Sequence, residues 1–97
     1  MDVTETLEKL NINDTFVIKA DLIRNSPIDD TKEIDNNTKL NFYKYYKQAT
    51  LGDCNSTCPS IFELSKRAQW NAWNNIKGTV KEDAMKMYIY YADIYIN

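Results

Sequence analysis

Apolar residues recur at intervals of three and four along most of this chain, which is the spacing of one face of an α-helix. The first such run begins at Phe16 and stops before Pro27, whose ring disfavours helical geometry in the preceding residue. We therefore predict a first helix with Thr15 as its N-cap and an end near Asn25. Residues 1–14 lack a clear apolar period, and we expect an amino-terminal tail or a short lead-in helix there.

Three further runs with the same spacing follow, separated by polar connections. The second helix is expected to begin with Asn36 as its N-cap and to stop at Gly52. The third is expected over residues 65–77, and Gly78 follows it. Residues 79–82, TVKE, match a capping box, in which a Thr hydroxyl and a Glu carboxylate satisfy backbone N–H groups, and they predict the start of a fourth helix.

These four runs, with no strand pattern of comparable quality, predict an all-α bundle of four helices. Two glycines and two prolines are also few for an all-β chain, which needs many turns. A chain of 97 residues is long enough for one hydrophobic core and too short for two. We therefore expect a single domain over residues 15–97.

Charge is distributed unevenly along the chain, although the formal net charge is only −2. Residues 1–38 carry four Lys or Arg against nine Asp or Glu, a net charge of −5, whereas residues 39–86 carry eight against four, a net charge of +4. A locally basic but globally acidic chain suits a small anionic ligand better than long duplex DNA, which favours far more basic domains.

The chain contains no histidine and two cysteines, Cys54 and Cys58, which removes histidine-based catalysis and most zinc sites. We therefore expect no enzyme, no catalytic residue, no metal and no cofactor. We interpret the cysteines as reduced thiols of a cytoplasmic protein, with a redox-sensitive loop disulfide as the alternative. The amino terminus lacks a signal-peptide pattern, and residues 87–92, the most apolar run, are too few to cross a bilayer, so we expect no stable membrane insertion.

One stripe of the second predicted helix carries unusual chemistry. Tyr43, Tyr46 and Lys47 lie at i, i+3 and i+4, so two phenols and an ammonium share one face. The opposite side carries Phe42 and Ala49, which serve the core and leave this stripe free. An aromatic ring beside a cation stacks on a base and binds a phosphate, so the stripe predicts a site for a nucleotide-containing ligand.

Three ordered motifs surround this stripe: YKQATLGDCN at residues 46–55, AQWNAWN at residues 68–74 and KGTVKEDAM at residues 77–85, followed by Tyr88 and Ile89. With these motifs, spread over residues 16–96, the chain resembles the acyl-CoA-binding protein family. The resemblance implies an up-down-down-up four-helix fold. It also implies a monomeric intracellular carrier that binds long-chain acyl-CoA esters non-covalently.

The resemblance also implies roles for individual residues. Tyr46 would stack on the adenine, Tyr43 and Lys47 would hold the 3′-phosphate of the ribose, and Tyr88 would close the site from the fourth helix. A long acyl tail is costly in water, and burying each methylene contributes about 0.8 kcal/mol. We expect the tail to lie against apolar side chains of the first two helices such as Ile23 and Leu40.

Two parts of the implied site lie outside that stripe. Ala20 and Arg24 would contribute from the first helix to the ligand pocket. Gln69 stands just before the first tryptophan, where the family usually has a phosphate-binding lysine. Glutamine donates a hydrogen bond but carries no charge, so we expect weaker attraction unless Lys66 or Arg67 supplies it.

Alternatives from other functional classes remain open on the sequence. Lysines interleaved with tyrosines also suit a helical nucleic-acid-binding module, although the overall acidity opposes it, so we expect no nucleic acid. A protein-interaction bundle that kept the fold but lost the ligand would use Tyr90, Tyr91 and Tyr95 as its surface. We assign Trp70 and Trp73 to packing, because large aromatic residues at helical spacing usually belong to a core.

Overall fold

The computed structural model describes residues 3–25 and 35–96, with side chains described for residues 12–25 and 35–96. Over these ranges the secondary structure consists of four helices without strands, which confirms the all-α prediction. The helices are α1 (Val3–Asn25), α2 (Asn36–Leu51), α3 (Leu64–Asn75) and α4 (Lys81–Ile96).

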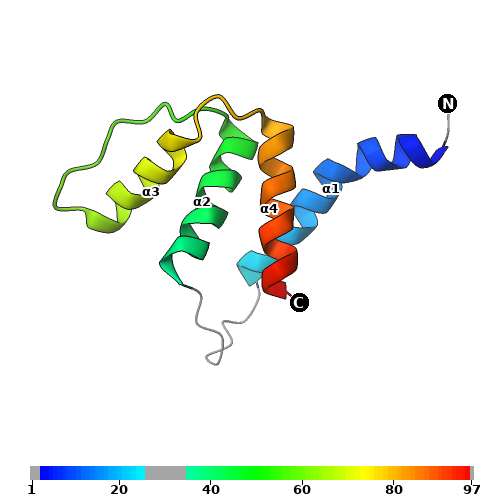
Figure 1. The fold of residues 1–97 in the computed structure, drawn as a ribbon, viewed down its shortest axis with the longest axis horizontal. Coiled ribbons are helices and arrows are strands. Elements are labelled where there is room, and N and C mark those ends of the chain that lie inside the picture. Colours follow the sequence, from blue (N-terminus) through cyan, green and yellow to red (C-terminus); the bar gives the residue numbers. More distant parts are fainter. Residues whose placement is uncertain (1–2, 26–34, 97) are drawn as a thin grey trace.

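The helices form a thin row in which α4 packs against both α1 and α2, and α3 packs against α2 (Figure 1). Helices α2 and α3 run in one direction, whereas α1 and α4 run in the other. This is the up-down-down-up arrangement that was predicted. The first turns of α1 extend beyond the other helices, at the end of the molecule opposite α3.

The core lies where α1, α2 and α4 meet. It is formed by small and aromatic side chains, namely Phe16, Ala20, Phe42, Ala49, Ala84, Tyr88 and Ala92. The ring of Tyr88 makes edge-to-face contacts with Phe16 at 5.2 Å and with Phe42 at 5.3 Å between ring centroids. The alanines of α4 are fully buried, which lets the backbones approach while these rings fill the remaining volume.

The predicted N-caps of the first two helices are wrong. Helix α1 begins at Val3, so Thr15 lies inside it and is not an N-cap. Residues 3–14 contain two Leu, two Glu and one Lys, which favour helix, and neither Gly nor Pro, which would break it. Helix α2 is capped by Asp35 rather than Asn36, because the Asp35 carboxylate accepts a hydrogen bond of 2.7 Å from the Thr38 backbone N–H. That bond lowers the pKa of Asp35.

The predicted helix ends agree more closely with the structure. Gly52 ends α2 with a φ of +84°, which only glycine adopts readily, and its N–H donates to the Gln48 carbonyl at 3.1 Å. Helix α3 ends at Asn75, two residues before the predicted end, and the chain turns at Gly78 with a φ of +93°. Helix α4 then begins at Lys81, one residue later than a capping box with Thr79 as the N-cap requires, and the Ala84 N–H donates to the carbonyl of Val80, the residue before the helix, at 3.0 Å.

A fully buried glutamine joins three segments of the chain. The Gln48 side chain has 0% of its surface exposed. Its Nε2 donates to the Thr79 carbonyl at 2.7 Å and to the Asp53 carboxylate at 2.9 Å. The same Asp53 oxygen accepts from the Gly78 N–H at 2.8 Å, and this bond, followed by the one from Gln48, lowers the pKa of Asp53. The end of α2 is thereby tied to the turn that starts α4.

The two tryptophans hold the long connection between α2 and α3. The Trp73 indole N–H donates to the Gly52 carbonyl at 2.9 Å, and the Trp70 indole N–H donates to the Ser56 carbonyl at 2.8 Å. Trp73 is buried, which confirms its predicted packing role, whereas Trp70 is half-buried and contacts the connection through its indole N–H. Cys54 and Cys58 lie in this connection as free thiols, the first buried and the second half-buried.

Replacing Gln48 by leucine tests the contribution of this network to stability. We expect Gln48→Leu to lower the free energy of unfolding by about 1–3 kcal/mol, because two hydrogen bonds, each contributing about 0.5–1.5 kcal/mol, are lost while the side-chain volume is kept. Urea denaturation measures the change. Thr50→Ala, an exposed substitution on the same helix, is the control and should stay within about 0.5 kcal/mol of wild type. Equal stability of the leucine variant and wild type would contradict this role.

Candidate functional site

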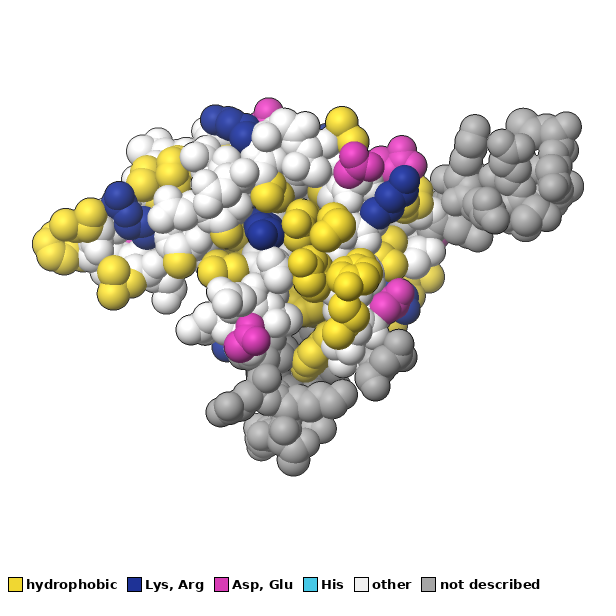
Figure 2. All heavy atoms as spheres, in the orientation of Figure 1, with side chains coloured by type: hydrophobic (Ala, Val, Ile, Leu, Met, Phe, Trp, Pro, Cys, Tyr) yellow, Lys and Arg dark blue, Asp and Glu magenta, His cyan; other side chains and the backbone are white. Residues whose placement is uncertain are grey.

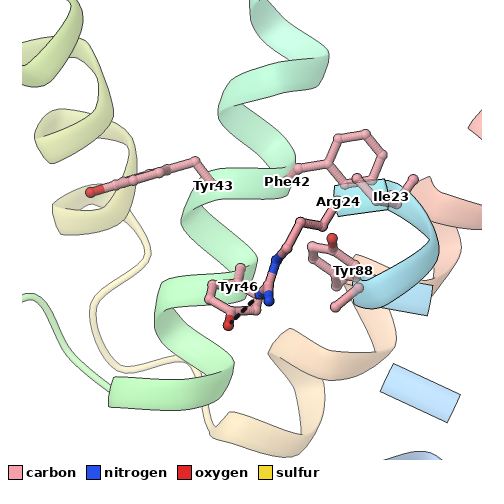
Figure 3. A pocket seen from close by; sticks show the side chains of 7 residues that line it. Ile23, Arg24, Phe42, Tyr43, Tyr46 and Tyr88 are labelled. Atoms are coloured by element: carbon pink, nitrogen blue, oxygen red, sulfur yellow. Dashed lines mark hydrogen bonds between the residues drawn. The ribbon is translucent and has the colours of Figure 1, made fainter. Parts of the chain in front are cut away.

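An open hollow of about 250 Å³ lies between the carboxyl-terminal end of α1, the middle of α2 and α4 (Figure 3). Three helices that are distant in the sequence therefore supply one surface. The residues that line it are Ala20, Ile23, Arg24, Phe42, Tyr43, Tyr46 and Tyr88. Most of this lining is aromatic or aliphatic, and Arg24 brings a positive charge to it.

Tyr88 forms the rigid floor of the hollow. Its side chain is only 4% exposed and is held between the rings of Phe16 and Phe42. The ring of Tyr46 lies beside it, with 6.2 Å between ring centroids. Burial raises the pKa of Tyr88 to about 12, and the nearby Tyr46 adds to this shift while the Arg24 cation opposes it. The floor is therefore an uncharged aromatic surface at neutral pH.

Arg24 lies against this floor from α1. Its Nη2 donates a hydrogen bond of 3.2 Å to the Tyr46 hydroxyl, and its guanidinium carbon lies 6.0 Å from the Tyr46 ring centroid (Figure 3). The side chain is exposed, so this contact is held weakly and the guanidinium is available to another acceptor. The arrangement presents a planar cation and a planar ring side by side.

Tyr43 and Lys47 continue the site along α2 towards α3. The Tyr43 side chain points away from Tyr46 and towards α3 (Figure 3). The Lys47 ammonium lies 5.7 Å from the Tyr43 ring centroid and 5.8 Å from the Trp73 ring, between the two aromatic side chains. Lys47 is not among the residues that line the hollow, and it adds a second cation beside its edge.

The structure thus brings together most of the residues that the sequence selected. Ala20, Arg24, Tyr43, Tyr46 and Tyr88 line the hollow, and Lys47 lies next to Tyr43. Gln69 lies on α3 with a half-buried side chain and does not line the hollow.

The two cations that we considered as substitutes for a lysine at position 69 contact the loop before α3. The Lys66 ammonium lies 3.4 Å from the Glu63 carboxylate. The Arg67 guanidinium donates to the Pro59 carbonyl at 3.2 Å. Neither side chain lines the hollow.

Phe42 and the contact between Arg24 and Tyr46 were missed by the sequence analysis. Phe42 was assigned to the core alone, but its ring also forms a wall of the hollow. Its position next to Tyr43 was the available signal. The hydrogen bond from Arg24 to Tyr46 joins residues 22 positions apart, and no periodicity within one helix predicts it.

A second hollow, of about 350 Å³, lies between α2 and α3. Its lining is mostly polar and includes four asparagines, Asn37, Asn41, Asn71 and Asn75. The aliphatic part comes from two alanines, Ala68 and Ala72, and from Leu40, which was expected beside the acyl tail but does not line the first hollow. Among the described residues, no group of three or more Cys, Asp or Glu side chains is placed to hold a metal ion. No helix in the described ranges is both long and apolar enough to cross a membrane.

Comparison with known proteins identifies the same family along most of the chain. The model of the family described as Acyl CoA binding protein matches residues 13–92. The chain is 38% identical over 78 residues to the Acyl-CoA-binding domain-containing protein 6 homolog of Dictyostelium discoideum. It is 38% identical over 74 residues to the Acyl-CoA-binding domain-containing protein 5 of Xenopus laevis. These matches cover 80% and 76% of this chain but only 27% and 16% of the relatives.

Solved structures agree with this assignment over nearly their whole length. Acyl-CoA-Binding Protein 2 of Oryza sativa superposes with a TM-score of 0.81 and 32% identity, covering 92% of each chain. The ACBP from Moniliophthora perniciosa gives a TM-score of 0.77 and 29% identity, covering 87% of this chain and 91% of that one. The acyl CoA binding protein from Babesia bovis gives 0.72 and 38%, covering 84% and 89%.

The raised pKa of Tyr88 predicts how stability depends on pH. Below pH 10, the ordinary value, Tyr88 is protonated in both the folded and the unfolded chain, and its contribution is fully present. Between pH 10 and about 12 the unfolded chain loses this proton while the folded protein keeps it, so the free energy of unfolding falls as the pH rises. Burial raises the pKa of Tyr43 and Tyr45 as well, which adds to the fall.

Denaturation series of wild type and Tyr88→Phe across this pH window measure the effect. The phenylalanine variant should lose less stability than wild type, because it has no phenol to ionise. Tyr90→Phe, at a largely exposed position, is the matched control and should follow wild type. If the free energy of unfolding of Tyr88→Phe fell with pH as steeply as that of wild type, the raised pKa of Tyr88 would be contradicted.

Proposed function

Because this chain belongs to the acyl-CoA-binding protein family, we propose that it binds long-chain fatty acyl-CoA esters non-covalently and carries them inside the cell. The observation that supports this most directly is the hollow in which the Arg24 cation lies beside the rings of Tyr46 and Tyr88. A nucleotide needs both a flat surface for its base and fixed positive charge for its phosphates. Cytoplasmic location and a monomeric state are parts of the same proposal.

The head group of the ester uses the polar part of the site. The adenine stacks on Tyr46, and the 3′-phosphate of the ribose accepts hydrogen bonds from the Tyr43 hydroxyl and the Lys47 ammonium. Arg24 contacts the Tyr46 hydroxyl at 3.2 Å in the free protein, and on binding its guanidinium exchanges this neutral acceptor for a phosphate oxygen. A hydrogen bond between two charged groups is stronger than one to a neutral phenol, so the exchange favours the ligand.

The acyl tail uses the apolar part. Ala20, Ile23 and Phe42 give the hollow an apolar wall that is continuous with the aromatic floor. Each methylene moved from water to such a surface contributes about 0.8 kcal/mol before the costs of binding are subtracted. Free fatty acid lacks the phosphates and free CoA lacks the tail, so only the ester makes both sets of contacts.

The lining of the hollow supports binding rather than catalysis. A covalent mechanism needs a nucleophile next to a base, and a general acid or base needs a pKa near the working pH. The titratable lining residues are phenols and a guanidinium, and the pKa of Tyr88 and of Tyr43 is shifted upward, away from neutrality. These groups suit recognition of an anion and leave the ester unchanged.

Calorimetric titration with palmitoyl-CoA tests the function, with free CoA and palmitate as matched ligands. We expect one ester per protein molecule and binding of either half that is weaker by at least about a hundredfold, since each half loses several kcal/mol of contacts. Lys47→Ala should weaken ester binding by about tenfold, because it removes a charge-assisted hydrogen bond to phosphate. Lys39→Ala removes one charge from the same helix away from the hollow and should have little effect. A folded sample that does not bind the ester would contradict the proposal.

The effect of Gln69 is tested by restoring the lysine that the family usually has at this position. Because Lys66 and Arg67 contact Glu63 and Pro59 instead, we expect Gln69→Lys to tighten ester binding by about three- to tenfold at low salt. Added salt should reduce this gain, since the new contact is ionic. Gln69→Met, which adds no charge, is the control. Equal affinity of wild type and the lysine variant would mean that another cation already supplies the contact.

A further inference from the structure

Three large apolar side chains are exposed at the tip of the connection between α2 and α3. Ile61, Phe62 and Leu64 are 63%, 89% and 76% exposed. The tip forms the outer end of the molecule beside α3, on the side away from α1, and hydrophobic side chains gather there next to a Lys or Arg side chain (Figures 1 and 2). Single exposed apolar residues are common, but a cluster of three this exposed indicates a contact surface.

The local structure holds these side chains outward. The Ser60 carbonyl accepts a hydrogen bond of 3.0 Å from the Glu63 N–H, which closes a tight turn with Ile61 and Phe62 at its two central positions. The Phe62 N–H donates to the Ser60 hydroxyl at 3.2 Å, which stabilises the same turn. Central turn positions usually carry small or polar residues, so two large apolar residues there serve no local folding purpose.

The base of the tip is also fixed. The Arg67 guanidinium donates to the Pro59 carbonyl at 3.2 Å, which joins the first turn of α3 to the chain before the tip. The Trp70 indole anchors the same connection at Ser56. The apolar side chains therefore lie on a turn whose backbone is already held by hydrogen bonds. Because the backbone is ordered beforehand, little conformational entropy is lost when these side chains bind another surface.

The charge around the tip identifies the surface that it suits. Residues 59–67, which form the tip and the first turn of α3, contain two cations and one acidic residue, Glu63, for a net charge of +1 in a chain whose net charge is −2. The two cations, Lys66 and Arg67, follow the tip within one helical turn. A convex apolar tip with cations behind it matches the boundary of an anionic bilayer, where apolar side chains enter the acyl region and cations contact phosphates.

We propose that Ile61, Phe62 and Leu64 form a membrane-contact tip that inserts reversibly into the surface of anionic lipid bilayers. The Lys66 side chain, which is 71% exposed, and the Arg67 N–H groups that do not bind Pro59 contact the lipid phosphates beside it. The contact is peripheral and involves no membrane-spanning segment. Its purpose rests on the proposed function, because long-chain acyl-CoA is itself an amphiphile that partitions into bilayers. The tip would hold the protein at the surface where such a ligand is found.

Sedimentation with vesicles free of acyl-CoA tests the tip independently of ligand binding. Vesicles of phosphatidylcholine with about a third of phosphatidylserine should retain wild-type protein, and retention should fall with added salt and on pure phosphatidylcholine. Phe62→Ser should weaken partitioning of the protein onto the vesicles by at least about tenfold, because one large apolar side chain no longer enters the bilayer. Ile94→Ser, at a position 60% exposed on α4, is the matched control and should bind as wild type.

A second measurement reports insertion directly. Lipids brominated in their acyl chains quench tryptophan fluorescence only at short range, so Phe62→Trp should show quenching beyond that of wild type, which contains Trp70 and Trp73. Quenching equal to wild type, or equal vesicle retention of wild type and Phe62→Ser, would overturn the proposal. A dimer in solution that Phe62→Ser abolishes, without vesicle binding by wild type, would instead identify a second copy as the occupant and overturn it as well.

The two proposals fail in different ways. Vesicle binding without ester binding in the calorimeter would contradict the proposed carrier function but support the membrane-contact tip. Ester binding in solution without vesicle binding would support the carrier function but contradict the membrane-contact tip. Phe62→Ser should bind the ester in solution as wild type does, because Phe62 does not line the hollow.

Discussion

The position of α2 relative to α4 depends on one buried amide. The Gln48 side chain, without any exposed surface, donates at once to Thr79 before α4 and to Asp53 after α2. A buried amide that lost these acceptors would cost more free energy than the hydrogen bonds contribute, so the two segments are strongly constrained to stay together. This constraint fixes the register in which the rings of α2 meet those of α4.

The candidate site follows from that register. Phe42 and Tyr46 lie on successive turns of α2, and both contact Tyr88 of α4. Phe16 of α1 packs against Tyr88 as well, and two turns later the same helix places Arg24 beside Tyr46. A shift of one helical turn between α2 and α4 would separate these rings and remove the floor of the hollow. The same contacts therefore stabilise the fold and shape the surface that a ligand meets.

The connection between α2 and α3 combines two requirements. Its inner part is tied down by Trp70 and Trp73, each of which donates to a backbone carbonyl of the connection. Its outer part carries Ile61 and Phe62 on a hydrogen-bonded turn. Both side chains are largely exposed, so packing in the core of this chain does not explain why they are apolar. Polar anchoring of one end allows the other end to present apolar side chains without collapsing onto the bundle.

Apolar periodicity, together with glycine and proline positions, was enough to predict the four helices from the sequence. The site residues that the sequence indicated include most of the lining of the hollow. Gly52 could be recognised as a helix stop because a positive φ strongly favours glycine, and Phe42 and Ala49 could be assigned to the core from their shared face. The caps were less predictable, because Asp35 and Asn36 are both good N-cap residues and only the formed turn selects between them. Tertiary structure alone decided that Arg24 contacts Tyr46, that Gln69 lies outside the hollow and that Gln48 is the buried link. Periodicity describes one helix at a time, whereas these features depend on how separate helices meet.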